Sequence, residues 1–203
     1  MAKFKAQNKP KIPIPDMYCN KSLNQYLDDL AAKLPAPGGG SAAALNAALG
    51  ASLISMVVNF TLGKSKYMQY ESELKVILGK SEKLREQFLE LVDLDVAAYK
   101  SKNMRDALDI PFMVCRLAFE AIRLCPALIK KGNVNLISDV AVAAVLLESA
   151  FTSAYFNVDI NLKSIGDEKL TQAVRKELGH KEKLVRKVRM EIEKKIEAFL
   201  NKD

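Results

Sequence analysis

Two aspartates of this sequence stand where they could exchange protons with a bound molecule. Asp95 falls on an apolar stripe, one helical turn after Leu91 and one before Tyr99, and Asp139 precedes a long apolar segment. A carboxyl group sheltered from water has a raised pKa, so it can act as a general acid or base near neutral pH. A structural role fits equally well: a core hydrogen bond for Asp95 and a helix-dipole partner for Asp139.

A glycine-rich loop, Gly38-Gly39-Gly40-Ser41, stands before an alanine-rich segment. Glycines leave backbone N–H groups accessible, and a helix N-terminus carries partial positive charge, so the loop could hold a carboxylate or a phosphate. The loop lacks the lysine of a phosphate-binding P-loop, and two prolines, Pro35 and Pro37, come just before it. A plain tight turn is therefore the alternative interpretation.

Two asparagines, Asn157 and Asn161, lie one turn apart if the apolar helix continues past Phe156. A side-chain amide offers a donor and an acceptor together, which suits the edge of a heterocycle. Asp139 and Asn157 are 18 residues apart, so one helix would place them on the same face but roughly 27 Å apart. Either they hold different ends of an elongated ligand, or a second subunit brings them together.

The composition indicates a globular protein with a substantial core. The chain has 203 residues, of which 49% are hydrophobic and 27% charged, a balance that argues against disorder. Polar residues interrupt the apolar run over 139–158, which favours a core helix over a membrane span. Residues 1–15 contain no apolar signal region, and the three cysteines form no Cys-x-x-Cys pair, so we expect free thiols and a cytoplasmic location.

The charged residues narrow the chemistry further. One histidine, His180, lies in a charged stretch, so histidine triads and zinc hydrolysis are excluded and no metal is expected. The net charge of +7 favours an anionic partner. The basic residues near the C-terminus alternate with glutamates, as on a solvated helix face, so an anionic small molecule fits this charge balance as well as nucleic acid does. A nucleic-acid-binding bundle is the weaker alternative, and no membrane partner is expected.

Hydrophobic periodicity predicts an all-α protein, a single-domain bundle of long antiparallel helices spanning residues 21–203 after a basic arm over residues 1–20. The expected helices cover residues 22–34, 42–62, 65–102, 111–131, 138–154 and 167–203, and the fifth would have to continue past Phe156 to include both asparagines. Ser22, Ser138 and Asp167 are the expected N-caps. Pro111 is expected to open its helix, and Gly63 to end the alanine-rich one.

Several segments, taken together and in order, are more specific than any one motif. They are Pro35-Ala36-Pro37-Gly38-Gly39-Gly40-Ser41, Thr61-Leu62-Gly63-Lys64, Leu91-Val92-Asp93-Leu94-Asp95, Gly132-Asn133, Ser138-Asp139, Tyr155-Phe156-Asn157-Val158 and Ile160-Asn161-Leu162. As a set they resemble the family of formiminotetrahydrofolate cyclodeaminases and methenyltetrahydrofolate cyclohydrolases. That family usually carries a longer stretch where residues 103–110 stand here.

The resemblance implies an all-helical homodimer that acts on a tetrahydrofolate derivative as substrate, with no permanently bound cofactor. One expected reaction is hydrolysis of 5,10-methenyltetrahydrofolate to 10-formyltetrahydrofolate. The alternatives are the cyclodeaminase reaction, which releases ammonia, and a non-catalytic dimer that binds folate or a protein. We expect no fused transferase domain that would supply formimino-folate, which favours the cyclohydrolase reaction slightly.

The resemblance also implies roles for individual residues. Asp139 is the expected acid/base, with Asp95 as its supporter or substitute. The expected substrate-binding residues are Gly38, Gly39, Gly40, Ser41, Lys64, Ser138, Asn157 and Asn161. The loop residues would hold an anionic or polar part of the folate, Lys64 would supply positive charge, and the asparagines would orient the ligand.

Overall fold

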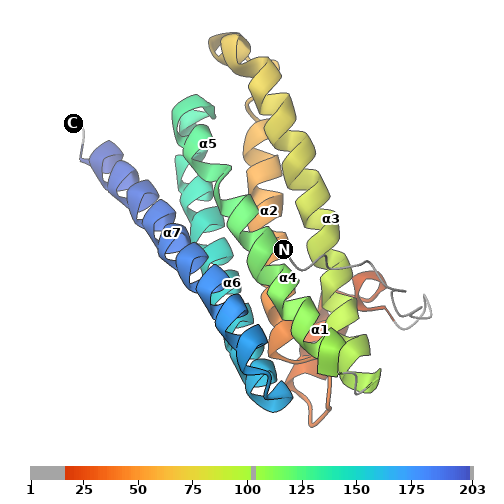
Figure 1. Ribbon diagram of the computed structural model, residues 1–203. Helices are drawn as coiled ribbons and strands as arrows, with labels where there is room; N and C mark the ends of the chain where they lie inside the picture. Colours follow the sequence, from red (N-terminus) through yellow and green to blue (C-terminus); the bar gives the residue numbers. More distant parts are fainter. Residues whose placement is uncertain (1–16, 102–103, 202–203) are drawn as a thin grey trace.

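Long helices run side by side along the molecule in the computed structural model, which describes residues 17–101 and 104–201 (Figure 1). The helices are α1 (Leu23–Ala31), α2 (Gly39–Asn59), α3 (Glu71–Ser101), α4 (Met104–Ile122), α5 (Cys125–Lys131), α6 (Ile137–Ile165) and α7 (Glu168–Leu200). Short 3-10 turns occupy Tyr18–Asn20, Ser65–Tyr70 and Val134–Leu136. The described residues contain no strand, so the predicted all-α class is confirmed.

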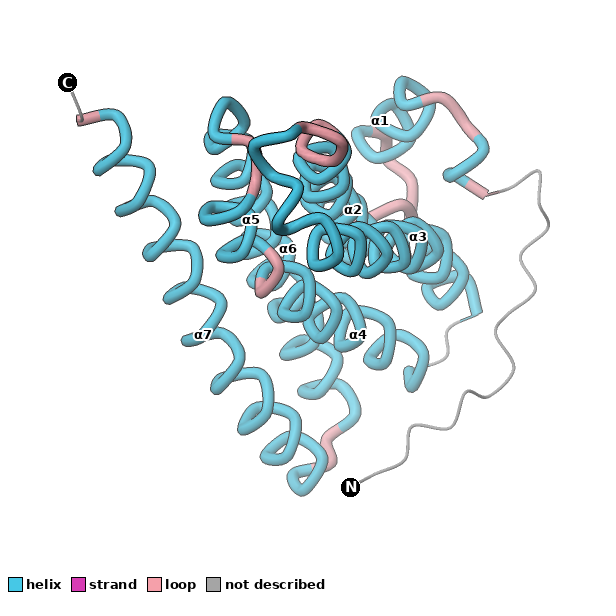
Figure 2. The backbone as a smooth tube through the Cα atoms, turned by 90° about the horizontal axis from the view of Figure 1, so that it is seen from above, coloured by secondary structure: helices cyan, strands magenta, loops and turns pink. Residues whose placement is uncertain are grey.

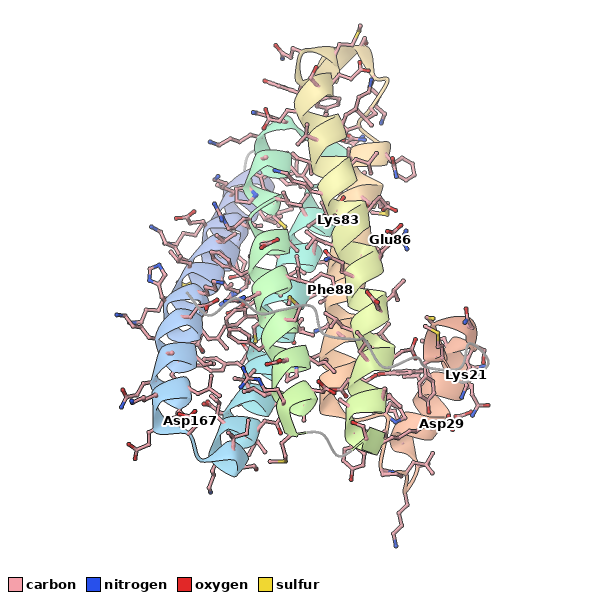
Figure 3. The ribbon with its side chains drawn as sticks, turned by 45° about the vertical axis from the view of Figure 1, so that its right-hand side comes forward. Lys21, Asp29, Lys83, Glu86, Phe88 and Asp167 are labelled. Carbon is pink, nitrogen blue, oxygen red and sulfur yellow. The ribbon has the colours of Figure 1, made fainter. Side chains whose placement is uncertain are left out.

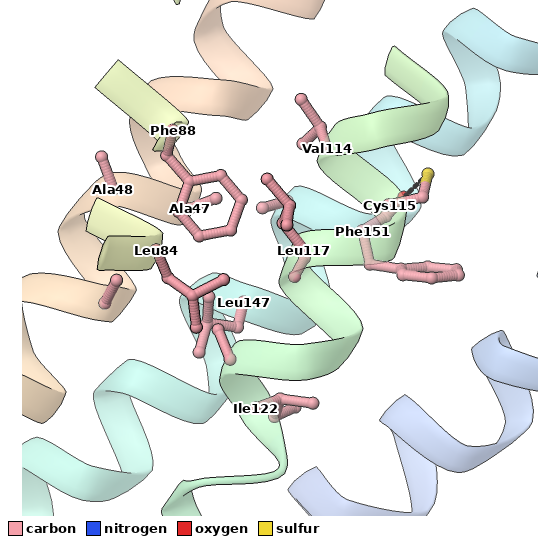
Figure 4. Packing of buried hydrophobic residues seen from close by; sticks show 14 of the residues in the cluster. Ala47, Ala48, Leu84, Phe88, Val114, Cys115, Leu117, Ile122, Leu147 and Phe151 are labelled. Carbon is pink, nitrogen blue, oxygen red and sulfur yellow. Dashed lines mark hydrogen bonds between the residues drawn. The ribbon is translucent and has the colours of Figure 1, made fainter. Parts of the chain in front are cut away.

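The centre of the bundle is α2, which packs against α3 on one side and α6 on the other. Small residues make this possible: Ala47 and Ala51 are fully buried, and a Cβ added to Gly50 would lie 2.7 Å from Leu147 Cγ on α6. Larger side chains fill the spaces between α3, α4 and α6, including Phe88 and Leu147 (Figure 4). Seen from above, α7 and α1 lie at opposite edges (Figure 2).

The proline at position 111 lies inside α4, so the prediction that it opens a helix was wrong. A proline within a helix has no N–H for the carbonyl of the residue four positions earlier, here Ala107. The side chain of Asn161 on α6 compensates, because its Nδ2 donates to Ala107 O at 2.6 Å. A neighbouring helix thus satisfies the carbonyl, and α4 begins at Met104. Most of the expected connection over 103–110 is therefore helical, while residues 102–103 lie outside the described residues.

Two of the three predicted N-caps are confirmed. Ser22 Oγ accepts from Gln25 N at 3.1 Å, and Asp167 accepts from Leu170 N at 3.0 Å; Figure 3 shows Asp167 at the turn between α6 and α7. Ser138 is not a cap, because α6 already begins at Ile137 and makes no side-chain cap bond.

Several helix ends also differ from the predicted ones. The first helix ends at Ala31 rather than Leu34, and the segment expected as one helix over 65–102 starts with a 3-10 turn. The segment expected over 111–131 is divided between α4 and α5. Gly63 has a positive φ of 76° and lies in the turn beyond Asn59, where α2 ends. It shapes that turn rather than ending the helix.

The last helix is held to the bundle by ion pairs. Arg116 on α4 donates two bonds of 2.8 Å to the carboxylate of Glu177 on α7, and Lys181 donates a third. Hydrogen bonds from Arg116 lower the pKa of Glu177 to about 2. A lowered pKa means that the pair stabilises the fold above the ordinary glutamate range and that this contribution is lost as the pH falls towards 2.

Glu177→Gln is accordingly expected to lower the Tm at pH 7 by about 2–4 °C, the shift that about 1 kcal/mol gives in a domain of this size. Thermal melts followed by circular dichroism would measure it, and the gap from the parent should narrow as the pH falls from 4.5 to about 2. Asp159→Asn breaks the more exposed pair with Arg175 and should cost less. An equal loss of Tm in both variants would contradict the larger contribution to stability that we assign to Glu177.

Apolar side chains remain exposed or half-buried on α2 and α6. They are Leu49, Leu53 and Met56 from α2, Phe60 directly after it, and Val142, Val145, Phe156 and Ile160 from α6; we call this set the apolar face. The two helices adjoin there, because Asn46 Nδ2 donates to Leu146 O at 3.2 Å. Both are long and apolar enough to cross a membrane by composition, yet 61% of the most apolar part of α2 is buried against 33% for α6. Burial in the core explains the apolar composition of α2, whereas much of the apolar surface of α6 stays exposed.

Candidate active site

Six of the ten predicted site residues gather in one cavity, where α2 begins. We call it the glycine-loop cavity; its volume is about 300 Å³. The lining comes from the loop before α2 and from α3, α4 and α6: Pro35, Ala36, Gly38, Gly39, Gly40, Asp95, Ala98, Tyr99, Ala107, Asn157 and Asn161. Segments far apart in the sequence thus meet at one end of the bundle.

The carboxyl group in this cavity is that of Asp95, which α3 directs at the first turn of α2. Its Oδ2 accepts from Ser41 N at 2.8 Å, so it satisfies an N–H group that a helix leaves unpaired at its start. Burial raises the pKa of Asp95, and the hydrogen bond from Ser41 acts in the opposite direction. The group is therefore both a cap supplied by another helix and a sheltered carboxylate beside a cavity.

The position of Asp95 requires a glycine opposite it. A Cβ added to Gly40 would lie 2.1 Å from Asp95 Oδ1, far inside any real contact. At Gly39 the added Cβ would lie 3.7 Å from Asn157 Nδ2, an ordinary contact distance. The loop is thus more than a tight turn, because at Gly40 the missing side chain makes room for the carboxylate.

Both predicted asparagines lie in the cavity wall, and each already makes one hydrogen bond within the protein. Asn157 Nδ2 donates to Ser153 O at 3.0 Å on its own helix, and Asn161 Nδ2 donates to Ala107 O. The second bond ties α6 to α4 at the carbonyl that Pro111 leaves free. Asn161 therefore has a structural function, whatever it does with a ligand.

Of the four other predicted residues, Ser41 lies beside the cavity in the first turn of α2, and three lie at the opposite end of α2 and α6. Lys64 follows the end of α2, and Ser138 and Asp139 belong to the first turn of α6. Hydrogen bonds join these regions, since Asn133 N donates to Thr61 Oγ1 at 2.9 Å. Ser138 is exposed and Asp139 is half-buried. The chain thus contains two groups of predicted residues rather than one site.

The separation follows from the length of α6. Asp139 lies in its first turn, and Asn157 lies 18 residues further along the same helix, a distance of roughly 27 Å at 1.5 Å per residue. The distance inferred from the sequence thus applies to this fold, because α6 is continuous from Ile137 to Ile165.

Two buried residues outside the cavity lining were given no role by the sequence. Asp93, only 3% exposed, accepts from the backbone N–H groups of Tyr18 and Cys19 at 2.5 and 3.3 Å. Tyr26 Oη lies 3.2 Å from Ser41 Oγ. The only sequence signal was the placement of Tyr26 on the apolar face of its helix; its hydroxyl partner could not be foreseen.

Comparison with known proteins connects this geometry to a family. The family model described as formiminotransferase-cyclodeaminase matches residues 22–102 and 100–180. A methenyltetrahydrofolate cyclohydrolase of Methylorubrum extorquens is 37% identical over 182 residues, which cover 78% of this chain and 88% of that protein. A formimidoyltransferase-cyclodeaminase of Rattus norvegicus is 32% identical over 76% of this chain, which spans only 33% of that longer protein.

A solved structure agrees with these sequence matches. The crystal structure of formiminotetrahydrofolate cyclodeaminase from Thermotoga maritima superposes with a TM-score of 0.85 at 29% identity, covering 89% of this chain and 98% of that chain. The family match spans the glycine loop, Asp95, Asp139 and both asparagines. The chain therefore belongs to the formiminotransferase-cyclodeaminase family.

Proposed function

We propose that this protein hydrolyses 5,10-methenyltetrahydrofolate to 10-formyltetrahydrofolate, with Asp95 in the glycine-loop cavity as the general acid/base. The observation that carries this proposal is the half-sheltered carboxylate held over Gly40 by the N–H of Ser41. A cyclohydrolase from Methylorubrum extorquens is the relative that this chain matches over most of both lengths.

The reaction asks little of the protein beyond positioning and proton transfer. The methenyl carbon is part of an amidinium-like cation and is already electrophilic. A water oxygen forms a bond to that carbon and gives a proton to the carboxylate of Asp95. The carbon–N5 bond then breaks, N5 takes a proton, and the added hydroxyl loses its proton to become the formyl group. One proton is released overall, and the anionic carboxylate also complements the cationic substrate.

The cyclodeaminase reaction is the second candidate, supported by the names of the rat protein and of the Thermotoga maritima structure. There N10 attacks the formimino carbon and ammonia departs from it, so an acid must protonate the leaving nitrogen. The same carboxyl group could supply that proton. The two reactions differ in whether water or N10 attacks and in whether ammonia is released.

Two assays separate these reactions from a non-catalytic binding protein. The absorbance of methenyltetrahydrofolate should decay in proportion to the amount of purified protein, faster than without it. Ammonia release from 5-formiminotetrahydrofolate would instead identify the cyclodeaminase. Folate binding by calorimetry without turnover in either assay would show that the chain binds folate but does not transform it.

We further propose that two copies pair through the apolar face and that this pairing completes the site. Helix α2 contains no charged residue, and Glu148, the one charged residue of α6 between Val142 and Phe156, pairs with Arg189 on α7, as expected of a surface covered in an assembly. A two-fold axis across the middle of α6, near Ser149, would align the helices of the two copies in opposite directions. Asp139, Ser138 and Lys64 of one copy would then approach the glycine-loop cavity of the other.

Mixed dimers test this arrangement. Asp95→Asn and Asp139→Asn should each be weakly active, whereas an equal mixture that has exchanged subunits should recover about a quarter of the parent activity, since half the dimers carry one intact site of two. No recovery after proven exchange would contradict a shared site. Full activity of Asp139→Asn alone would remove that residue from the mechanism.

A further inference from the structure

We propose that Tyr26 is a positioning residue for this reaction: its hydroxyl holds Ser41, and Ser41 holds Asp95 in the cavity. The proposal rests on the proposed function of the glycine-loop cavity. Tyr26 lies on α1, Ser41 in the first turn of α2 and Asp95 on α3. Three elements therefore meet through one serine.

Ser41 contacts both neighbours with different atoms. Its side-chain Oγ lies 3.2 Å from Tyr26 Oη, and its backbone N–H donates to Asp95 Oδ2 at 2.8 Å. The exposed fractions of Tyr26 and Ser41 are 4% and 0%, so water does not compete for the bond between their hydroxyls. Both hydroxyls would be costly to bury without a partner.

The attachment of α1 to the bundle depends on this residue. Tyr26 is the buried residue of α1, whereas Leu23 and Leu27 are 65% and 48% exposed. The Tyr18 ring packs edge-on against the Tyr26 ring, with centroids 5.3 Å apart, and Tyr18 N–H is itself held by Asp93. Figure 3 shows α1, marked by Asp29, beside the main bundle. If residue 26 only anchored α1 by apolar contacts, its side chain would not need a hydroxyl group.

The consequence for Asp95 is electrostatic as well as geometric. If the first turn of α2 shifts, the N–H of Ser41 moves away from the carboxylate, and the hydrogen bond that lowers the pKa of Asp95 weakens. The titratable groups beside Asp95 are Tyr26 on α1 and Tyr99 on α3, while the cavity residues from α2, α4 and α6 carry no charge. Loss of the Ser41 bond therefore raises the pKa of Asp95 further.

Tyr26→Phe tests the proposal because it removes the hydroxyl and keeps the ring. We expect kcat to fall about 10-fold with KM nearly unchanged, and the acidic limb of the kcat profile to move to higher pH. Ser41→Ala should have a similar effect, and the double variant should be little worse than either single one. As a matched control, Tyr70→Phe removes a phenolic hydroxyl from the Ser65–Tyr70 turn, outside the cavity lining.

A second readout does not depend on activity. Carbon NMR of the Asp95 carboxyl group should show a higher titration midpoint in Tyr26→Phe than in the parent, even if the chain proves to have neither folate activity. A fall in Tm with unchanged midpoint and unchanged pH profile would overturn the proposal, because Tyr26 would then only support the fold. Absence of turnover in the parent with a shifted midpoint would instead overturn the proposed function and leave the positioning role standing.

Discussion

Asp95→Asn should reduce kcat for methenyltetrahydrofolate hydrolysis by about 10²–10⁴-fold, the range that a positioned general acid/base contributes. Asparagine keeps the shape of the side chain and still offers an oxygen to Ser41 N–H, but it cannot accept the proton of the attacking water. Steady-state assays over a pH series would measure the loss. The parent should lose activity as the pH falls through the raised pKa of Asp95, and this acidic limb should be absent from the residual activity of the variant.

The stability of the same variant separates catalysis from capping. Because burial raises the pKa of Asp95, its contribution to stability is present at low pH and lost as the pH rises through that pKa. At pH 7 the variant should therefore have a Tm equal to or above that of the parent. A marked fall in Tm would show that Asp95 is mainly a structural cap.

Asp93→Asn is the contrasting control. Asp93 is nearly fully buried and accepts from two backbone N–H groups of the Tyr18–Asn20 turn, and an amide cannot match a carboxylate in both bonds. We expect this variant to lose stability rather than the acidic limb of the pH profile. The two aspartates are two residues apart on α3, so they point to different sides and should respond differently.

Gly40→Ala should have the second largest effect. The added methyl group would lie 2.1 Å from Asp95 Oδ1, so the carboxylate must leave its place over the loop. Overpacking of this kind costs about 1–3 kcal/mol, and displacing a catalytic group by about 1 Å can cost about 100-fold in rate. Thermal melts and the absorbance assay would measure both losses.

Two further variants identify the cause of that loss. Gly38→Ala places a methyl group where no atom lies within 4 Å, so it should change the Tm little. Gly40→Ala combined with Asp95→Ala removes the clashing carboxylate and should recover most of the lost Tm without recovering activity. If Gly40→Ala keeps full activity, Asp95 is not working from the position described.

The sequence predicted the cavity better than it predicted the helix ends. Periodicity placed Asp95 on a buried stripe, and the glycine loop was correctly expected at the start of α2, because both features depend on local spacing. The carboxylate over Gly40 could not be foreseen, since the contact joins residues 55 positions apart in sequence. Which of the two aspartates is catalytic stays a prediction.

The errors at Pro111 and Ser138 have different physical causes. Local rules place proline at the first turn of a helix and serine at its cap. At Pro111 a tertiary contact overrides the rule, because Asn161 satisfies the carbonyl that the proline leaves free. At Ser138 the 3-10 turn Val134–Leu136 leads directly into α6, so the serine already lies inside the helix.

The hydrogen bond from Asn161 to the Ala107 carbonyl of α4 also affects which groups the cavity wall presents to a ligand. The amide nitrogens of Asn157 and Asn161 both donate to carbonyl oxygens of the protein, which leaves their Oδ1 atoms as the freer hydrogen-bonding groups. With the carboxylate of Asp95, the wall is rich in acceptors. Such a wall favours a molecule that presents N–H groups along one edge.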